Sequence, residues 1–419
     1  MLHKLAFRSA IALLVLAICA VASRASAGDF AEQELLADAA DGRLDHFSLL
    51  DAATIAGGVS DKADVTAARG RLESLWLEVG QPLIVGLPQR DRARAIFSAT
   101  HRLVLTGKYH AECTEVNRTL ATGDFNCVTA TVLYLDRCRR HGLEGFAVAI
   151  PGHVYCRLSS SSREPSGTKN RDVQTTCVDW FDVQEGRAAS AAAAALTRQI
   201  AAEKVAPREL TDVQLIGKVY YNRGVSYLEA HDYAKAIELL EISIALDAED
   251  QPAANNLLAA HNNWALALCD AGDFTQAAEK LAAARTIDPH YAPLQTNDLY
   301  VHQKWVLRLC DLGRYSAAVD LLDQGFQRRP EAPLFDGGRF AVYGMWSKSL
   351  LEAGRLNEAL TVLQSARKRF GENEELLRQE MQAFESAIDT LTRNGDEVAA
   401  ARLAELARSR NPQADFATK

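Results

Sequence analysis

The 419-residue sequence lacks several features that would point to common classes of function. It contains no CxxC pair and no grouping of Cys and His at the spacing of a zinc site, which argues against a bound metal. It has no stripe of Lys and Arg, and its formal net charge is −8, so a nucleic-acid partner is not expected. The sequence therefore predicts neither a metal nor a cofactor.

Long apolar segments are also missing, except near the start of the chain. An apolar run covers residues 10–22, with Lys4 and Arg8 before it and the small-x-small sequence ASA at residues 25–27 after it. Because a bilayer span needs about 20 apolar residues, we interpret residues 1–27 as a secretory signal peptide, with an uncleaved membrane anchor as the alternative. We expect a periplasmic or secreted protein with no stable membrane span after cleavage.

Cysteine usage fits an exported protein with at least one free thiol. Seven of the eight cysteines lie beyond the predicted signal peptide, and an odd number cannot all pair within one chain. Cys127 and Cys138 are eleven positions apart on one predicted helix, about three turns, which is too far for a disulfide.

The second half of the sequence repeats itself with a period of 41 residues. Four residue types recur at this spacing: Ala236, Ala277, Ala318, Ala359 and Ala400; Leu240, Leu281, Leu322 and Leu363; Gly272, Gly313, Gly354 and Gly395; and Trp264, Trp305 and Trp346. Each unit predicts a helix, a tight turn at Gly and a second helix. The first unit has His231 in place of the Gly. The pattern resembles the tetratricopeptide repeat, whose period is about 34 residues, and the excess predicts one extra turn in each helix.

Such units bury their apolar faces only by stacking, so residues 206–419 are predicted to form an all-α, TPR-like solenoid of five units that binds a protein or peptide partner. We expect the Trp ladder to be core between helices, with an exposed ligand-stacking row as the alternative. Cys269 and Cys310 are interpreted as buried packing residues. The Ala-rich stretch before Pro207 predicts a helical linker.

The first domain, residues 28–205, contains a thiol in an unusual place. Residues 29–113 show helical periodicity, and a further helix is predicted to start at Cys127, capped by Asp124 or Asn126. Free amides and the helix dipole in a first turn stabilise a thiolate, so we expect a lowered pKa for Cys127 and a role as nucleophile.

Two extended segments follow this helix, flanking Pro151-Gly152, and a third begins near Asp172. The start of the helix and the starts of two strands can converge at one end of a sheet, which would bring Cys127, His153 and Asp172 together as nucleophile, base and orienting group. The residues alone leave another interpretation open, in which Cys127 is a small buried hydrophobe and His153 an ordinary strand residue.

The same segments resemble the transglutaminase-like cysteine-peptidase superfamily, which has a papain-like core. The resemblance rests on Asn126-Cys127 opening a helix, on "HGLEGFAVAIPGHVYCRL", and on Asp172 in "RDVQTT". It implies an α+β domain of helices plus a small antiparallel sheet, with Cys127 as nucleophile, His153 as general base and Asp172 orienting the imidazole. Asp179 is the second candidate for the orienting role.

Three functions are compatible with these observations. The first is an exported cysteine-dependent amide or peptide hydrolase acting through an acyl-enzyme, with the repeats binding a substrate or partner protein. The second is a non-catalytic scaffold with a degenerate enzyme fold, because the front domain is also similar to bacterial domains of the SirB1 type, many of which lack the cysteine. The third is a true protein-cross-linking transglutaminase.

Overall fold

The computed structural model describes residues 30–77, 86–159, 170–176, 206–371 and 373–410. The chain divides into two compact units, residues 1–260 and 261–419. The predicted signal peptide, the Ala-rich linker and Asp179 lie outside the described residues. Within the described part, no helix combines the length and the apolar character that a membrane crossing requires.

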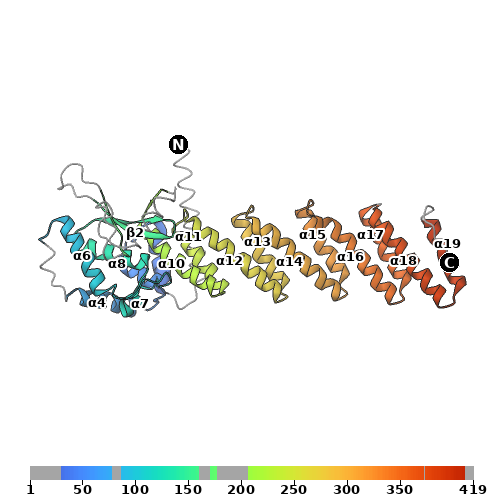
Figure 1. Ribbon diagram of the computed structural model, residues 1–419, viewed down its shortest axis with the longest axis horizontal. Coiled ribbons are helices and arrows are strands. Elements are labelled where there is room, and N and C mark those ends of the chain that lie inside the picture. Colours follow the sequence, from blue (N-terminus) through green and yellow to red (C-terminus); the bar gives the residue numbers. More distant parts are fainter. Residues whose placement is uncertain (1–29, 78–85, 160–169, 177–205, 372, 411–419) are drawn as a thin grey trace. The chain divides into compact units, whose positions relative to one another are not determined.

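Helices make up most of the first unit. They are α2 (Phe30–Asp38), η1 (Ala39–Asp41), α3 (Leu49–Ala56), α4 (Lys62–Leu77), α6 (Gln89–Leu103), α7 (Val116–Thr122) and α8 (Cys127–Arg140). Helix α8 packs against the sheet and against α3 and α6 (Figure 1). All its side chains from Cys127 to Cys138 are buried. The predicted helix therefore forms the centre of the unit, and Cys127 is its first residue.

A four-stranded antiparallel sheet covers α8. Its strands are β1 (Gly145–Ile150), β2 (His153–Leu158), β3 (Arg171–Val173) and β4 (Arg208–Leu210), in the order β3-β2-β1-β4. Ile150 pairs with His153 across the two-residue turn Pro151-Gly152, and Gly152 has a φ of 71°, which glycine adopts readily. The predicted combination of helices and a small antiparallel sheet is confirmed.

Strand β4 changes the expected domain boundary. It follows Pro207 directly and pairs with β1, and the helix after it packs on α3 and α8. The first compact unit therefore continues to Ala260 and includes the first repeat. The predicted boundary between residues 205 and 206 lies inside this unit, because β4 pairs with β1 and α10 packs on α3 and α8.

Helical hairpins with a 41-residue period form the rest of the chain. They are α10 (Asp212–Glu229) with α11 (Tyr233–Leu246), α12 (Gln251–Asp270) with α13 (Phe274–Ile287), α14 (Ala292–Asp311) with α15 (Tyr315–Arg328), α16 (Pro333–Glu352) with α17 (Leu356–Phe370), and α18 (Glu374–Arg393) with α19 (Glu397–Arg410). The predicted five TPR-like units are all present. The expectation of one extra turn in each helix is wrong: from α12 onward the first helix of a unit has 20 residues and the second has 14 or 15.

The turn inside each hairpin explains the glycine ladder. Gly272, Gly313, Gly354 and Gly395 have φ values from 70° to 83°, in the left-handed region that disfavours residues with a Cβ. His231 occupies the same position in the first unit with a φ of 61°. The first hairpin therefore contains a strained residue that the other four avoid.

We expect His231→Gly to stabilise the first unit by about 1 kcal/mol, because glycine removes the left-handed strain. Part of the gain is offset by the higher entropy of glycine in the unfolded chain. The measurement is the free energy of unfolding in urea, with Gly272→His as the reciprocal variant, expected to destabilise by a similar amount. A loss of stability in His231→Gly would mean that the 2.9 Å contact between the His231 ring and the Tyr233 hydroxyl outweighs the strain.

Within the second unit the repeated residues pack as the spacing predicts. Ala277, Ala318 and Ala359 have no exposed surface, and Cys269 and Cys310 are buried. The tryptophans lie between helices of adjacent hairpins: Trp305 stacks on Phe274 and Trp346 stacks on Tyr315, with ring centroids 6.3 and 5.9 Å apart. They are half-buried rather than fully enclosed, so they combine packing with an exposed edge.

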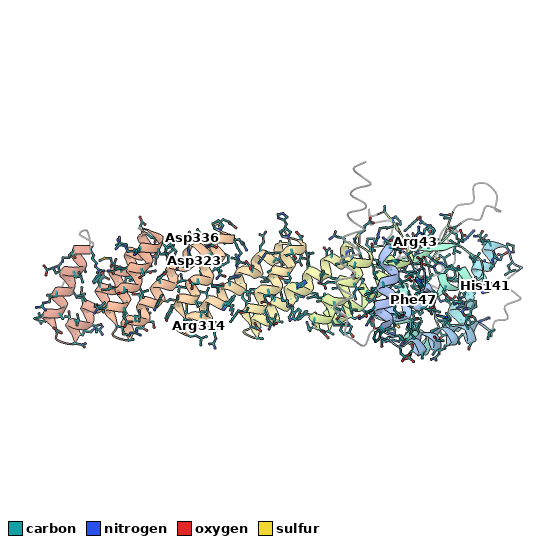
Figure 2. The ribbon with its side chains drawn as sticks, turned by 180° about the vertical axis from the view of Figure 1, so that it is seen from behind. Arg43, Phe47, His141, Arg314, Asp323 and Asp336 are labelled. Carbon is teal, nitrogen blue, oxygen red and sulfur yellow. The ribbon has the colours of Figure 1, made fainter. Side chains whose placement is uncertain are left out.

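Buried charges also follow the period of the array. Asp298, Arg339 and Glu380 occupy equivalent positions on α14, α16 and α18, and each is at most 8% exposed. Arg339 lies near two carboxylates, Asp323 on α15 at 3.6 Å and Asp336 on its own helix at 2.9 Å. Figure 2 labels these two aspartates, which lie close together in the array. Asp298 and Glu380 each have arginine partners. Each junction therefore buries a compensated charge, which requires the helices to keep their register.

Candidate active site

Asn126 fixes the start of α8 and so the position of Cys127. Its Oδ1 accepts the backbone N–H groups of Val128 and Thr129, both at 3.0 Å, and its own N–H donates to the Thr129 hydroxyl at 3.0 Å. Its Nδ2 donates to the Ala111 carbonyl at 2.9 Å and to the Thr114 hydroxyl at 2.7 Å. Of the two predicted caps, Asp124 and Asn126, it is Asn126 that caps α8, and its side chain also ties the helix to the preceding loop.

The thiol of Cys127 is only 8% exposed but is surrounded by hydrogen-bond donors. The Tyr109 hydroxyl and the backbone N–H groups of Val154, Val128 and Cys127 itself face the sulfur. Burial nevertheless raises the pKa of the Cys127 thiol above its ordinary value, and these hydrogen bonds only partly oppose the increase. The expectation of a lowered pKa is therefore wrong, because the cost of burying a charged sulfur outweighs the stabilisation of a thiolate by the helix terminus.

His153 begins β2 and is also 8% exposed. Its Nε2 lies 2.8 Å from Oε1 of Gln174. An amide oxygen only accepts hydrogen bonds, so Nε2 carries the proton and Nδ1 remains the acceptor in the neutral ring. Burial lowers the pKa of His153, more than the contact with Gln174 raises it. A neutral imidazole with a fixed tautomer is a suitable general base.

Asp172 does not orient His153. In the antiparallel register Asp172 lies opposite Arg157, and its carboxylate accepts from Arg157 Nε at 2.5 Å and from Nη2 at 3.0 Å. Gln174 is two residues further along the chain, so it lies on the same side of the sheet but closer to the start of β2. The predicted Cys127, His153 and Asp172 arrangement is corrected accordingly: Gln174 occupies the orienting position and Asp172 belongs to an ion pair.

The end of β3 is attached to α8 next to the site. Thr175 and Thr131 share a hydrogen bond of 2.8 Å between their hydroxyl oxygens, and both residues are buried. This bond fixes the segment that carries Gln174 relative to the helix that carries Cys127. The orienting residue is therefore held by the same helix that positions the sulfur.

Cys127 and His153 line one cleft of about 350 Å³ in the first unit, together with the β1–β2 turn. Among the described contacts, the sulfur's side-chain hydrogen bond is to Tyr109, and none joins it to the imidazole. The structure thus brings the two predicted reactive groups to a common cavity but leaves the Cys127–His153 hydrogen bond unmade.

Two residues of the site were not predicted from the sequence. Gln174 could have been found from the sequence, because residues two positions apart in a strand lie on the same face and Gln174 is two positions after Asp172. Tyr109 could not have been found in this way, because a backbone bridge between Tyr109 and Phe125 joins its segment to the residues just before α8, and a contact of this kind leaves no local pattern in the sequence. In the part of the chain that the structure describes, no cluster of His, Cys, Asp and Glu has the arrangement of a metal site.

Tyr109→Phe is expected to slow alkylation of Cys127 by iodoacetamide at pH 8 by about three- to tenfold. The lost hydrogen bond destabilises the thiolate, and one pKa unit corresponds to a tenfold change in thiolate fraction. The rate constant is measured by mass spectrometry of intact protein. Tyr155→Phe is the control, because the Tyr155 hydroxyl contacts Arg157 and is expected to change the rate less than about twofold. Faster alkylation in Tyr109→Phe would mean that the hydroxyl chiefly shields the sulfur.

No family model matches the chain, and no curated protein does. Among solved structures, the chain is similar to MamA from MSR-1 (20% identity, 46% of this chain and 95% of that chain, TM-score 0.16). It is also similar to YrrB, a TPR protein with an unusual peptide-binding site (13% identity, 46% of this chain and 86% of that chain, TM-score 0.17). The helical hairpins themselves establish the TPR-like architecture of the second half of the chain. The transglutaminase-like character of the first unit stays a prediction.

Proposed function

We propose that the protein is an exported cysteine-dependent amide or peptide hydrolase of transglutaminase-like type, with Cys127 as nucleophile and His153 as general base. The proposal also assigns the TPR-like array to binding a protein substrate or partner. The observation that carries it is that Cys127, at a capped helix start, and His153, with its tautomer set by Gln174, line the same cleft. Acyl transfer needs a thiol nucleophile and a general base that can both reach one substrate carbonyl, and the shared cleft gives the two residues access to the same bound group.

The chemistry proceeds from two neutral groups. The sulfur leaves its contact with Tyr109, transfers its proton to Nδ1 of His153 and attacks the substrate carbonyl carbon. The oxyanion of the tetrahedral intermediate is stabilised by backbone N–H groups at the start of α8. The imidazolium then protonates the departing amine, the C–N bond breaks and an acyl-enzyme remains. Water, deprotonated by His153, attacks the thioester and releases the acid and the thiol.

A labelling experiment tests the proposal. Acetyl-Ala-Ala-Ala chloromethyl ketone, in which the sulfur displaces chloride, should modify the folded protein once, at Cys127, as measured by intact mass and peptide mapping. Cys127→Ala should abolish the modification. Cys113, which is fully buried, serves as the internal control and should remain unmodified. Modification of Cys127 no faster than that of a free cysteine in unfolded protein would contradict the hydrolase.

The rate of this labelling should depend on pH through His153. Only the neutral imidazole accepts the thiol proton, so the rate rises as His153 loses its proton, and burial places the midpoint below the ordinary value of 6.5. The rate should then stay level to about pH 9, because the raised pKa of Cys127 keeps the thiol protonated over this range. Ultraviolet absorbance of a Cys127-dependent thiolate at neutral pH would instead indicate a preformed thiolate–imidazolium pair. A labelling rate that increases only above pH 9 would indicate that the thiol ionises by itself and that His153 does not act as a general base.

The non-catalytic scaffold is the second candidate, favoured by the raised thiol pKa and the unmade Cys127–His153 hydrogen bond. The distinction is made by incubating the wild-type protein with a peptide library and searching for Cys127-dependent cleavage. A labelled amine added to the same reaction tests for cross-linking: incorporation into glutamine side chains would identify a transglutaminase, and release of acid alone would identify a hydrolase.

A further inference from the structure

The candidate cleft has a second wall that comes from the first repeat hairpin. This wall is formed by Lys218, Tyr221 and Asn222 on α10 and by the turn between α11 and α12, which contains Glu249 and Asp250. All of these residues belong to the first compact unit. The repeat region therefore contributes side chains to the cavity that contains Cys127.

Asp250 on this wall has one carboxylate oxygen without a partner. The residue is 3% exposed, and its Oδ2 accepts from the Lys218 ammonium at 2.7 Å. Its Oδ1 is buried and receives no hydrogen bond from any described residue. Buried carboxylate oxygens are usually satisfied in folded proteins, so Oδ1 keeps the capacity to accept one further hydrogen bond.

Asp247, in the same turn, is a buried carboxylate whose contacts are all within the protein. It is 1% exposed, but both of its oxygens accept from Arg208, and Gln214 donates to one of them at 3.4 Å. Asp247 does not line the cleft, whereas Asp250 does. Of these two carboxylates, the one with an unpartnered oxygen therefore belongs to the residue that lines the cleft.

The surroundings of Asp250 select the kind of donor. The Lys218 ammonium already neutralises the carboxylate, so a second cation at Oδ1 would be repelled, while a neutral N–H would not. The Tyr221 hydroxyl lies on the same wall and accepts from Asn256 at 3.2 Å, which leaves its own proton for an acceptor. An acceptor beside a donor matches the N–H and C=O groups of a peptide backbone.

We propose that Asp250 Oδ1 accepts a backbone N–H of a peptide bound in the cleft, and that the first repeat hairpin is thereby part of the substrate site. The inference rests on the proposed function and narrows its substrate to a peptide chain. The inference assigns Asp250 a role in substrate specificity. Its Oδ1 contacts the peptide backbone, and the amide bond that breaks is the one that the Cys127 sulfur attacks.

The test pairs backbone methylation of the ligand with substitution of Asp250. Acetyl-Ala-Ala-Ala chloromethyl ketone and iodoacetyl-Ala-Ala-Ala amide, which extend to opposite sides of the sulfur, are prepared with each amide N-methylated in turn. Rates of Cys127 modification are divided by the rate with iodoacetamide. In the wild-type protein we expect methylation at one position to lower this rate ratio at least about tenfold. In Asp250→Ala, methylation at the same position should lower the ratio less than about twofold, because the hydrogen bond that methylation removes is already absent.

Controls separate recognition from folding and from reactivity. Glu229→Gln changes an exposed carboxylate at the end of α10, outside the residues that line the cleft, and should leave every ratio unchanged. If Asp250→Ala fails to fold, Asp250→Leu combined with Lys218→Met removes both charges together and takes its place. The same methylation penalty in wild type and variant, or no sensitivity to methylation at any position, would overturn the assignment of Asp250.

Failure of the hydrolase and failure of this inference are distinguishable. If Cys127 resists every reagent, the proposed chemistry is rejected, and Asp250 is tested by binding alone. Saturation-transfer NMR of acetyl-Ala-Ala-Ala amide with Cys127→Ala protein should then show contact that is lost when Asp250→Ala is added. Absence of peptide contact with the Cys127→Ala protein would reject the peptide site itself.

Discussion

Replacing His153 by alanine is expected to lower the rate of Cys127 modification by the peptide chloromethyl ketone about 10²- to 10⁴-fold at pH 7.5, the usual effect of losing a general base. The reason is that burial keeps the Cys127 thiol protonated, so a nearby base has to remove the proton during attack. In the same assay Asp172→Asn should change the rate less than about threefold, because the Asp172 carboxylate binds Arg157 and not the imidazole.

Gln174→Ala completes this comparison. It removes the acceptor that holds the Nε2 proton of His153, so the ring can adopt the wrong tautomer or rotate, and we expect a loss of about tenfold or more. Gln174→Glu should retain the acceptor and restore part of the rate. A large loss in Asp172→Asn with an unchanged unfolding midpoint, together with a small one in Gln174→Ala, would restore the original assignment of Asp172.

Asn126→Ala is expected to destabilise the first unit by about 2–4 kcal/mol. The substitution removes the N-cap of α8 and also leaves the buried partners of Nδ2, the Ala111 carbonyl and the Thr114 hydroxyl, without a donor. The measurement is the shift of the transition assigned to the first unit in differential scanning calorimetry. Labelling of Cys127 should lose its dependence on His153 as the start of the helix frays.

Asn373→Ala is the matched control in the second unit. Asn373 caps α18 through Oδ1 in the same way, accepting from Glu375 and Leu376 at 2.9 and 3.3 Å, and it is less buried. We expect a loss of about 0.5–2 kcal/mol, the cost of a cap alone. Equal losses at the two positions would mean that the loop contacts of Asn126 contribute nothing beyond capping.

Several elements could be predicted from the sequence because local patterns encode them. The 41-residue ladder of Ala, Leu and Gly fixes where each hairpin turns, since only a left-handed residue fits there, and which faces are buried. The Asn126-Cys127 pair marks a helix start, and Pro151-Gly152 marks a two-residue strand connection. Each of these signals involves residues within a few positions of one another.

The distribution of extra residues between the two helices of a unit could not be predicted in this way. A period of 41 fixes only the sum of the two helix lengths, and the structure assigns 20 residues to the first helix of most units. The half-burial of Trp305 and Trp346 could not be predicted either. The 41-residue spacing shows that the two positions are equivalent, but packing between hairpins decides how much of each ring is covered.

By itself the sequence determined that this protein has a capped helix with a thiol at its start, a small antiparallel sheet with His153 at a strand start, and five repeating hairpins. Only the tertiary structure decided that Gln174 rather than Asp172 meets the imidazole, that Tyr109 contacts the sulfur and that the first repeat borders the cleft. Hydrogen-bond partners depend on strand register, and the pKa of Cys127 depends on how much water is excluded from around it. Both are set by segments that are far apart in the chain, so neither is encoded near the residue it controls.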